Sequence, residues 1–306
     1  MQIPHIPVLY NEVLEIFKDC KGVILDCTLG YGGHSFGLLN TNENIKIKAC
    51  DRDDEAVLFS KQRFSKFGDR IQIYKSKFSE FINLINQNDV CGILADIGVS
   101  SLQIDKNERG FSINSDELDM RMDKTQILNA KDVVNLYSKD ELARIFFNYA
   151  ELTNSYKIAE KIVSYRTNKT ITSAKELANI VNLNSIKGRN INPAILVFQA
   201  IRIEVNKELD ELENLLNLIE NSKINNAKVA IISFHSLEDR IVKNRFKKWE
   251  KNCICPDFFV KCECGKNHAL GKILSKKAIT ASKDEIKKNS RSSCAKMRVF
   301  EINRNI

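Results

Sequence analysis

Short runs of apolar residues alternate with amphipathic stretches over the first hundred positions of the chain. The short runs predict strands, and the stretches between them carry the apolar spacing of helices. Regular alternation of this kind predicts a mostly parallel sheet with helices on both faces, which is a doubly wound, Rossmann-like α/β fold. The predicted strands cover residues 22–26, 45–50, 70–75 and 90–96, and the predicted helices between them include 11–17 and 54–67.

After the fourth predicted strand the alternation stops. Residues 105–123 have neither helical nor strand periodicity, and residues 131–191 show helical patterns only. Long loops inside compact domains are usually functional or disordered. Large apolar residues in this one argue against disorder, among them Phe111, Leu118, Met120 and Met122. Within the helical block, Thr172 or Ser173 is a predicted N-cap, with Glu176 placed to complete a capping box on Ser173.

Asn192-Pro193 then predicts the start of one long amphipathic helix, whose apolar stripe runs from Val197 to Ile219. Strand patterning returns at residues 228–234. A helix-only block inside an alternating fold indicates an inserted domain. We therefore predict a discontinuous α/β domain formed by residues 1–104 and 200–306, interrupted by an all-helical insert at 105–199.

Composition limits the class of protein. The chain has 306 residues, of which 43% are hydrophobic and 28% charged, as in ordinary globular proteins. No window offers the run of about 18 apolar residues that a membrane span needs. The first residues lack the basic and apolar regions of a signal peptide, so the nine cysteines indicate reduced thiols and a cytoplasmic protein.

The net charge of +8 is unevenly distributed. Residues 240–306 hold 18 Lys and Arg against 6 Asp and Glu, so the rest of the chain is mildly acidic. A basic C-terminal region predicts contact with a polyanion such as a nucleic acid. The alternative is a solvated lysine-rich surface with no such partner.

Candidate chemistry begins where the first strands end. The first strand reaches Asp26 and then the glycine cluster Gly30-x-Gly32-Gly33, and the second strand ends at Asp51. This is the pattern of a nucleotide-binding half-domain, in which the second acid binds ribose hydroxyls. The spacing departs from G-x-G-x-x-G and suits S-adenosylmethionine, whose ammonium group Asp26 would hold. The alternative is an ordinary glycine turn between a strand and a helix.

Two later segments reach the same predicted edge of the sheet. Asp96 ends the fourth strand, and His235 follows the strand at 228–234. In open α/β sheets, ligands bind beyond the carboxyl ends of the strands. The alternatives are that Asp96 caps a helix and that His235 is an ordinary surface histidine.

Taken together, these segments resemble the RsmH/MraW family of bacterial methyltransferases, which modify N4 of a cytosine in 16S ribosomal RNA of the small ribosomal subunit. The likeness extends in order over essentially the whole chain. The matching stretches are residues 5–9, 26–35, 51–53, 96–101, 109–112, 118–123, 192–202, 233–240 and 293–298. The chain has Cys294 where the family usually has serine, and we expect no functional consequence.

The resemblance implies the cofactor and its contacts. S-adenosylmethionine is the expected cofactor, and the helical insert is expected to recognise RNA, with residues 105–123 as a lid or an RNA-contacting segment. The family's contacts with the methionine moiety fall on the loop residues Gly32, Gly33 and His34. Asp51 matches the acid that binds the ribose, and Phe78 matches the residue beside the adenine. Asp96 and Gln103 match the two remaining contacts.

Asp96 and His235 are also the predicted catalytic residues. Many base-amino methyltransferases place two prolines and an aromatic residue after the acid, but here Asp96 is followed by Ile97-Gly98-Val99. Without those residues, the weakly nucleophilic amine of cytosine still needs an acceptor for its N–H groups. Asp96 is expected to be that acceptor, and His235 to orient the base or take the released proton.

Four cysteines form a separate pattern near the C-terminus. Cys253-x-Cys255 and Cys262-x-Cys264, with His268 close by, offer four thiolates to zinc. However, this spacing is tighter than the usual C-x₂₋₄-C, and the family is not defined by a metal. Free thiols in a surface loop are the alternative, and we expect no metal site.

Three functional classes remain to be compared. A nicotinamide oxidoreductase would use the glycines and Asp51 but not Asp26 or the basic region, and a non-catalytic RNA-binding module would leave the nucleotide-binding half without a role. A methyltransferase acting on 16S ribosomal RNA, naked or in the small ribosomal subunit, accounts for all these features. No membrane partner is expected, and the sequence leaves a homodimer open. Thermal stabilisation by S-adenosylmethionine or by NAD separates a methyltransferase from an oxidoreductase.

Overall fold

A computed structural model describes residues 7–256, except 182–192, and residues 258–304. The chain divides into two compact units, the first formed by residues 1–98 and 210–306 and the second by residues 99–209. The predicted boundary at 199/200 falls inside helix α10 (Pro193–Asn206). Because Val197, Ile201 and Val205 all pack in the core of the second unit, the whole helix belongs to that unit.

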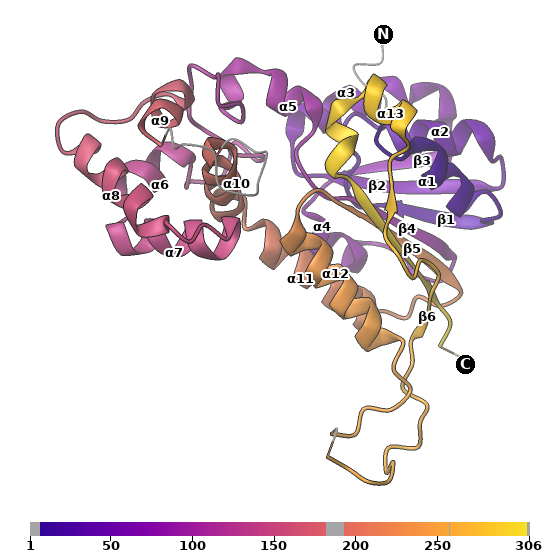
Figure 1. The fold of residues 1–306 in the computed structure, drawn as a ribbon. Helices are drawn as coiled ribbons and strands as arrows, with labels where there is room; N and C mark the ends of the chain where they lie inside the picture. Colours follow the sequence, from indigo (N-terminus) through magenta and orange to yellow (C-terminus); the bar gives the residue numbers. More distant parts are fainter. Residues whose placement is uncertain (1–6, 182–192, 257, 305–306) are drawn as a thin grey trace. The chain divides into compact units, whose positions relative to one another are not determined.

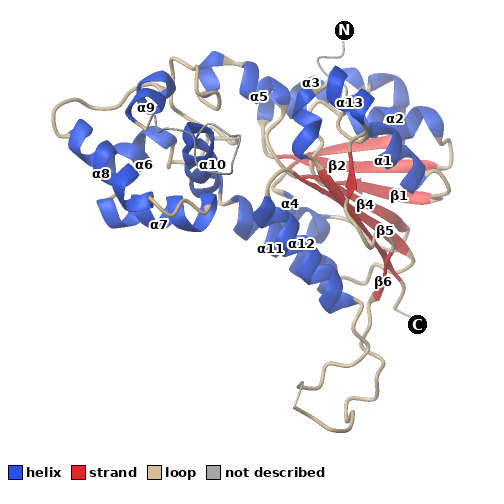
Figure 2. Cartoon of the chain, in the orientation of Figure 1, coloured by secondary structure: helices blue, strands red, loops and turns tan. Residues whose placement is uncertain are grey.

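The first unit contains an eight-stranded sheet in the order β3-β2-β1-β4-β5-β8-β6, with β7 also paired to β8 (Figures 1 and 2). The first five strands of this order are parallel, and β8 runs antiparallel to β5. The chain order reverses between β1 and β4, which is where doubly wound folds bind ligands. The strands are β1 (Gly22–Asp26), β2 (Ile45–Asp51), β3 (Ile71–Lys75), β4 (Val90–Asp96), β5 (Ala227–Ser233), β6 (Gly271–Ile273), β7 (Ile279–Thr280) and β8 (Lys296–Ile302).

Successive side chains of a strand point to opposite faces of the sheet, so the apolar central strands supply a hydrophobic core on each face. In β4, Leu94 joins the core that includes residues of α1 and α2, whereas Ile93 and Ala95 join the core that includes residues of α4, α11 and α12. Both faces are therefore covered, as the alternation predicts. The helices of this unit are α1 (Tyr10–Phe17), α2 (Gly33–Thr41), α3 (Asp54–Arg63), α4 (Phe78–Phe81), α11 (Glu208–Asn221), α12 (Ser236–Trp249) and α13 (Lys283–Lys288), with short 3₁₀ turns η1 (Ser65–Arg70), η2 (Ile82–Leu84) and η4 (Ser290–Cys294).

Two helix predictions were wrong in extent. The helix predicted at 54–67 ends at Arg63, and η1 follows with a kink at Gly68. The long helix predicted from Asn192 is two helices, α10 and α11, separated by Lys207, whose φ of 53° is left-handed and interrupts the helical backbone. The predicted cap at Asn192 lies outside the described residues.

The second unit is helical around one apolar core. Ser173 caps α9 by accepting the Glu176 N–H at 3.1 Å, as predicted, but the Glu176 carboxylate bonds the N–H of Thr172 and not that of Ser173. Among the described residues of the whole chain, no helix combines the length and the apolar content that crossing a membrane requires. The helices of this unit are α5 (Ser101–Asp105), α6 (Ala130–Leu136), α7 (Lys139–Ala150), α8 (Ser155–Arg166), α9 (Ala174–Ile180) and α10, with the 3₁₀ turn η3 (Asn107–Arg109).

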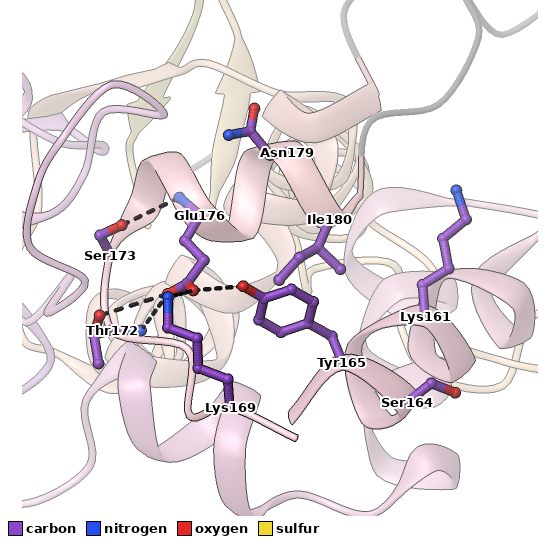
Figure 3. A pocket seen from close by; sticks show the side chains of 9 residues that line it. All are labelled: Lys161, Ser164, Tyr165, Lys169, Thr172, Ser173, Glu176, Asn179 and Ile180. Atoms are coloured by element: carbon purple, nitrogen blue, oxygen red, sulfur yellow. Dashed lines mark hydrogen bonds and ion pairs between the residues drawn. The ribbon is translucent and has the colours of Figure 1, made fainter. Parts of the chain in front are cut away.

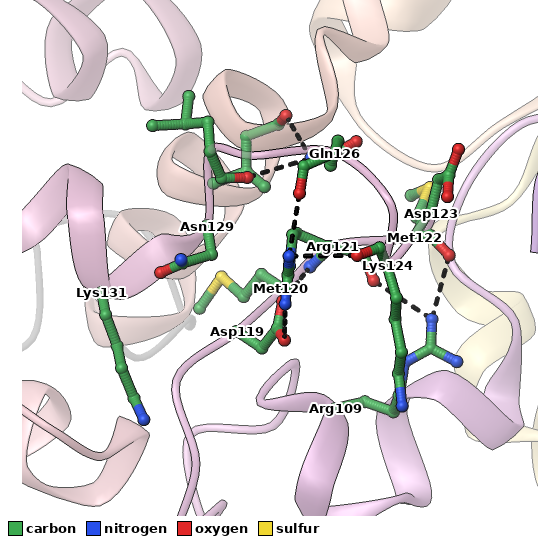
Figure 4. Close-up of polar contacts among 12 residues, drawn as sticks. Arg109, Asp119, Met120, Arg121, Met122, Asp123, Lys124, Gln126, Asn129 and Lys131 are labelled. Carbon is green, nitrogen blue, oxygen red and sulfur yellow. Dashed lines mark hydrogen bonds and ion pairs between the residues drawn. The ribbon is translucent and has the colours of Figure 1, made fainter.

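Residues 105–123 are packed, not loose (Figure 4). The buried Arg109 guanidinium donates to the carbonyl oxygens of Arg121 and Met122, both at 3.1 Å. Asn206 of α10 accepts the Met122 N–H and donates to the Met120 carbonyl. Leu118, Met120 and Met122 are buried. Its apolar residues and its buried arginine hold the segment to the unit's core. Its role as a lid or an RNA-contacting segment stays a prediction.

Candidate active site at the carboxyl edge of the sheet

The carboxyl ends of β1, β2 and β4 bring three aspartates to one edge of the sheet. Asp26, Asp51 and Asp96 are the last residues of these strands. The strands are adjacent and parallel, so their carboxyl ends face the same way. The prediction that these acids share an edge is confirmed by the strand order.

Asp51 is held by the glycine loop and by its own turn. Its Oδ2 accepts the Gly30 N–H at 2.7 Å, and its Oδ1 accepts the Asp53 N–H at 2.8 Å. Burial raises the pKa of Asp51 to about 6, while the two N–H donors act in the opposite direction. A carboxylate fixed by one donor on each oxygen keeps lone pairs for further hydroxyl donors.

His34 and Asp96 carry three buried polar atoms without a hydrogen-bond partner at this edge. His34 is in the first turn of α2, and its Nε2 lies 3.5 Å from Asp96 Oδ2. Both ring nitrogens of His34 and Oδ1 of Asp96 are buried without a hydrogen-bond partner among the described residues. Buried polar groups are nearly always satisfied, so such a group of atoms indicates a place for a polar ligand.

Asp26 has a different environment from its neighbours. Its side chain is 2% exposed. Its carboxylate accepts the Ser35 hydroxyl at 2.6 Å and the Thr28 N–H at 3.2 Å. Burial raises its pKa. These contacts anchor α2 to the end of β1. The contact between Asp26 and the ammonium group of the cofactor stays a prediction.

The glycines of the loop differ in what surrounds them. A Cβ on Gly32 would lie 2.3 Å from the Phe64 ring, and a Cβ on Gly33 would lie 2.3 Å from the Pro7 ring. A Cβ on Gly30 would meet nothing within 4 Å. Gly32 and Gly33 are therefore required by packing inside the protein, and Gly30 is the glycine that borders open space.

Phe78 lies beside the Asp51 end of β2. The Ser76 N–H donates to the Asp51 carbonyl oxygen at 3.1 Å, and Phe78 opens α4 two residues later. Its ring is half-buried against the core that α4 helps to form. The backbone thus brings Phe78 near the end of β2, and its contact with the adenine stays a prediction.

His235 is the N-cap of α12, not a freely exposed residue. Its Nδ1 accepts the Glu238 N–H at 3.4 Å, and its Nε2 lies 3.1 Å from Glu238 Oε1. Glu238 completes the capping box by accepting the N–H groups of Phe234 and His235. The interpretation of His235 as an ordinary surface histidine was wrong. Its Nδ1 is occupied by the cap, and its Nε2 faces Glu238 and is buried without a hydrogen-bond partner among the described residues. The capping contacts favour a positioning role, and the predicted catalytic role stays untested.

Gln103 is in the second unit, unlike the other predicted contacts. Its Oε1 accepts the Ser100 N–H at 2.9 Å, and the Ser100 hydroxyl accepts the Gln103 N–H at 3.2 Å. These two bonds form a capping box at the start of α5. The S-x-x-Q signature that would have revealed this role is present in the sequence.

The second unit has a surface hollow of its own (Figure 3). Its polar side chains pair with one another: Glu176 accepts from Lys169 at 2.6 Å and from the Tyr165 hydroxyl at 2.7 Å. Lys169 helps hold the pKa of Glu176 at about 2. None of the predicted site residues lines this hollow, and its mutual pairing leaves no sign of a site.

Sequence reasoning overlooked Thr28, and it named Gly30 in the glycine cluster without foreseeing its contact with Asp51. The Thr28 hydroxyl accepts the Asp96 N–H at 2.6 Å and so links the ends of β1 and β4. Gly30 supplies the N–H that fixes Asp51. Both lie in the segment that the glycine pattern singled out, and a hydroxyl placed two residues after a strand-end acid was the available signal for Thr28.

Comparison with known proteins places this geometry in a family. Residues 2–303 match the MraW methylase family. The chain belongs to the MraW methylase family. It is 63% identical to Ribosomal RNA small subunit methyltransferase H of Campylobacter fetus, over 100% of both chains. It is 64% identical to the protein of the same name from Campylobacter hominis, over 99% of this chain and 100% of that one.

A solved rRNA methylase from Streptococcus thermophilus is a much more distant match. It covers 99% of each chain at 8% identity, with a TM-score of 0.40. That likeness carries no argument about fold or function. Membership of the methylase family rests on the full-length sequence match.

Proposed function

We propose that this chain binds S-adenosylmethionine at the carboxyl edge of its sheet and methylates N4 of a cytosine in 16S ribosomal RNA. The observation that carries the proposal is the group of unpartnered atoms on His34 and Asp96, at the ligand-binding edge of a chain in a methylase family. The name shared by the Campylobacter relatives supports ribosomal RNA of the small subunit as the substrate.

The residues at this edge fit the cofactor. Asp51 keeps acceptor lone pairs for two ribose hydroxyls, and the neighbouring Phe78 ring offers a surface for the adenine. The backbone around Gly30 leaves room for the methionine moiety, and the ring nitrogens of His34 await polar partners. The cofactor supplies an electrophilic methyl group on a positively charged sulfur. The cofactor contact that the family resemblance implies for Gln103 stays a prediction.

Asp96 then acts on the base. The exocyclic amine of cytosine is a weak nucleophile because its lone pair is delocalised into the ring. Oδ1 of Asp96 is buried and unpartnered, and it accepts an N–H of this amine and so directs the lone pair at the methyl donor. As the N–C bond forms and the S–C bond breaks, the sulfur becomes neutral and Asp96 takes the proton that leaves the nitrogen. Oδ2 stays beside His34, and the Thr28 hydroxyl fixes the backbone of Asp96. Holding both reactants in line contributes most of the remaining rate.

His235 acts through position. By capping α12 it fixes the turn after β5, and Phe234 in that turn packs against Gly98, whose Cβ would lie 2.9 Å from the Phe234 ring. Gly98 directly follows Ile97, the neighbour of Asp96. Substitution of His235 should therefore change stability before it changes chemistry.

The substrate must bring an unstacked cytosine to this edge, so the target belongs to an accessible RNA segment. The helical second unit and the basic C-terminal region are the expected RNA-binding parts, and the small ribosomal subunit is the expected partner. We place the activity in the cytoplasm. Sedimentation of the purified protein measures whether it forms a homodimer.

The direct test is methylation of small subunits from a strain that lacks the enzyme, with mass mapping of the product. We expect one methyl group on N4 of a cytosine. A methyl group on ring carbon 5, or on another base, would contradict the proposal. Asp96→Ala should reduce turnover by about a hundred-fold or more. Its cofactor affinity, measured by calorimetry, separates lost catalysis from lost binding; turnover within a few-fold of wild type would exclude Asp96 from the reaction.

A further inference from the structure

A long loop joins α12 to β6 on the first unit. We call residues 250–270 the cysteine loop; its described residues form neither helix nor strand. Ile254 is 63% exposed, Phe258 81% and Val260 99%. Apolar residues this exposed cannot hold a loop together by burial. Loops of this length without secondary structure are uncommon in compact domains unless something else orders them.

The sulfur atoms of four cysteines converge within this loop. Cys253 Sγ lies 3.6 Å from Cys262 Sγ and 3.7 Å from Cys264 Sγ, and the last two are 3.5 Å apart. Cys255 Sγ completes a group whose atoms all lie within 4.8 Å of one another. These separations are much longer than the 2.0 Å or so of a disulfide bond. All four residues are free thiols.

The separations match a tetrahedral metal site. Four sulfurs at about 2.3 Å from a zinc ion lie about 3.8 Å apart at the corners of a tetrahedron. The three closest pairs in the loop fall within a few tenths of an ångström of this value. Cys-x-Cys pairs from two ends of a loop therefore reach the required spacing, despite being closer in sequence than most zinc ligands.

Backbone N–H groups point at the same sulfurs. The Ile254 N–H lies 3.4 Å from Cys264 Sγ, and the Glu263 N–H lies 3.3 Å from Cys255 Sγ. Cys253 also accepts the Cys255 N–H. Such donors stabilise negative charge on sulfur and orient thiolate ligands around a metal.

The turn after Cys264 has the backbone that such a site needs. Gly265 and Lys266 have left-handed φ values of 81° and 56°, and the Lys266 N–H bonds Cys264 Sγ. His268 Nε2 contacts the Cys264 carbonyl oxygen at 2.8 Å. The histidine thus supports the backbone of a ligand, which leaves four cysteines as the complete ligand set.

We propose that Cys253, Cys255, Cys262 and Cys264 bind one zinc ion that folds the cysteine loop. This replaces the expectation, drawn from ligand spacing, that the chain has no metal site. Four thiolates around Zn²⁺ leave a net charge of −2, which the backbone N–H groups directed at the sulfurs stabilise. The site is closed, with no open position for a substrate, so its role is structural.

The test measures metal in the purified full-length chain. Elemental analysis should find one zinc per chain after dialysis without strong chelators. Replacement with cobalt should give the intense visible bands and sulfur charge-transfer bands of a tetrahedral tetrathiolate. Cys255→Ser and Cys264→Ser should each lose the stoichiometric zinc. Cys294→Ser is the matched control, because Cys294 is an exposed thiol outside the loop, and it should retain one zinc.

Folding of the variants is followed independently. The sheet and the predicted cofactor contacts lie outside the cysteine loop, so both serine variants should bind S-adenosylmethionine like wild type. Zinc content in wild type no higher than in Cys264→Ser, measured after anaerobic reduction and zinc addition, would overturn the proposal. Stoichiometric iron in place of zinc would also overturn the proposal. So would the formation of two disulfides when the reduced protein is gently reoxidised in the presence of zinc.

Discussion

Asp51 combines two hydrogen-bond donors from the backbone with a partly buried carboxylate. Removing it should take away charge-assisted hydrogen bonds to the ribose without disturbing the sheet. We expect Asp51→Ala to weaken S-adenosylmethionine binding about ten-fold or more, which corresponds to roughly 1.5–3 kcal/mol. Asp54→Ala is the control, because Asp54 forms only an exposed pair with Lys75. Calorimetric titration that finds equal affinities for both variants would remove Asp51 from the site.

The raised pKa of Asp51 gives cofactor binding a pH dependence. Only the ionised carboxylate accepts hydrogen bonds from both ribose hydroxyls. Because burial raises its pKa to about 6, protonation as the pH falls through that value should reduce the affinity, and affinity should be constant above about pH 7. Titrations from about pH 8 down to about pH 5 measure this. Asp51→Ala should lose most of the pH dependence.

Substitutions at His235 distinguish a structural role of this residue from a catalytic one. Asparagine is a good N-cap but a poor proton acceptor, and alanine is neither. We expect His235→Asn to keep turnover within a few-fold of wild type. His235→Ala should lower the free energy of unfolding by about 1 kcal/mol. Denaturant unfolding and kcat measured on the same preparations decide the role. Loss of turnover in a stably folded His235→Asn variant would restore the catalytic interpretation.

At the scale of elements, α7 ends in a turn that favours glycine but contains Glu151. Its φ is 52°, its N–H bonds the Phe147 carbonyl oxygen at 3.0 Å, and the next N–H bonds that of Phe146 at 3.3 Å. This is a left-handed helix cap, where a side chain costs about 1 kcal/mol relative to glycine.

We therefore expect Glu151→Gly to raise the free energy of unfolding by about 1 kcal/mol. Glu151→Ala keeps a Cβ in the strained conformation and should bring no comparable gain. Thermal and denaturant unfolding measure both changes. A glycine variant less stable than the alanine variant would show that the left-handed conformation is not under strain.

The elements that could be predicted are those that a pattern within a short stretch of sequence specifies. Strands β1 to β5 were recognisable as apolar runs, and three of them end at the acids Asp26, Asp51 and Asp96, which the alternation of strands and helices places at one edge. The break at Lys207 was not predictable, because the apolar stripe continues through it and the two helices pack in different cores. Strand β8 was overlooked because its pairing partner β5 is far away in sequence.

The site was predictable in position more than in detail. Strand ends and glycines located it, and family resemblance assigned individual contacts. Packing then decided which glycines face a ligand: Gly32 and Gly33 fit against Phe64 and Pro7, which only the folded chain brings together. The engagement of Asp26 by Ser35 likewise depends on the direction in which α2 leaves the sheet.

At the scale of the whole molecule, the basic C-terminal region, residues 240–306, contains two groups of basic side chains. Arg245 and Arg298 are committed to acidic partners, the latter to Asp239 at 2.6 Å. Several lysines of the region are exposed instead, and these are the candidates for phosphate contacts. RNA affinity should therefore fall steeply with salt, mainly through the lysines.

Replacing exposed lysines should flatten this dependence. We expect glutamine at Lys247, Lys251, Lys276 and Lys277 to reduce the slope of log K against log salt, by up to about 0.7 to 0.9 for each phosphate that is no longer neutralised. Lys18→Gln with Lys21→Gln is the control, because both residues are exposed at the amino end of β1. An unchanged slope would assign the phosphate contacts to the helical unit.

The position of β8 also affects how the protein is made. Seven residues of β5 pair with β8, which begins at Lys296, more than sixty residues after β5 ends at Ser233. A ribosome adds about 5–20 residues per second, so a nascent chain waits several seconds with one side of β5 unpaired. An open strand edge invites pairing with other chains. A protein proposed to modify ribosomes is thus most exposed to aggregation while it is still attached to one.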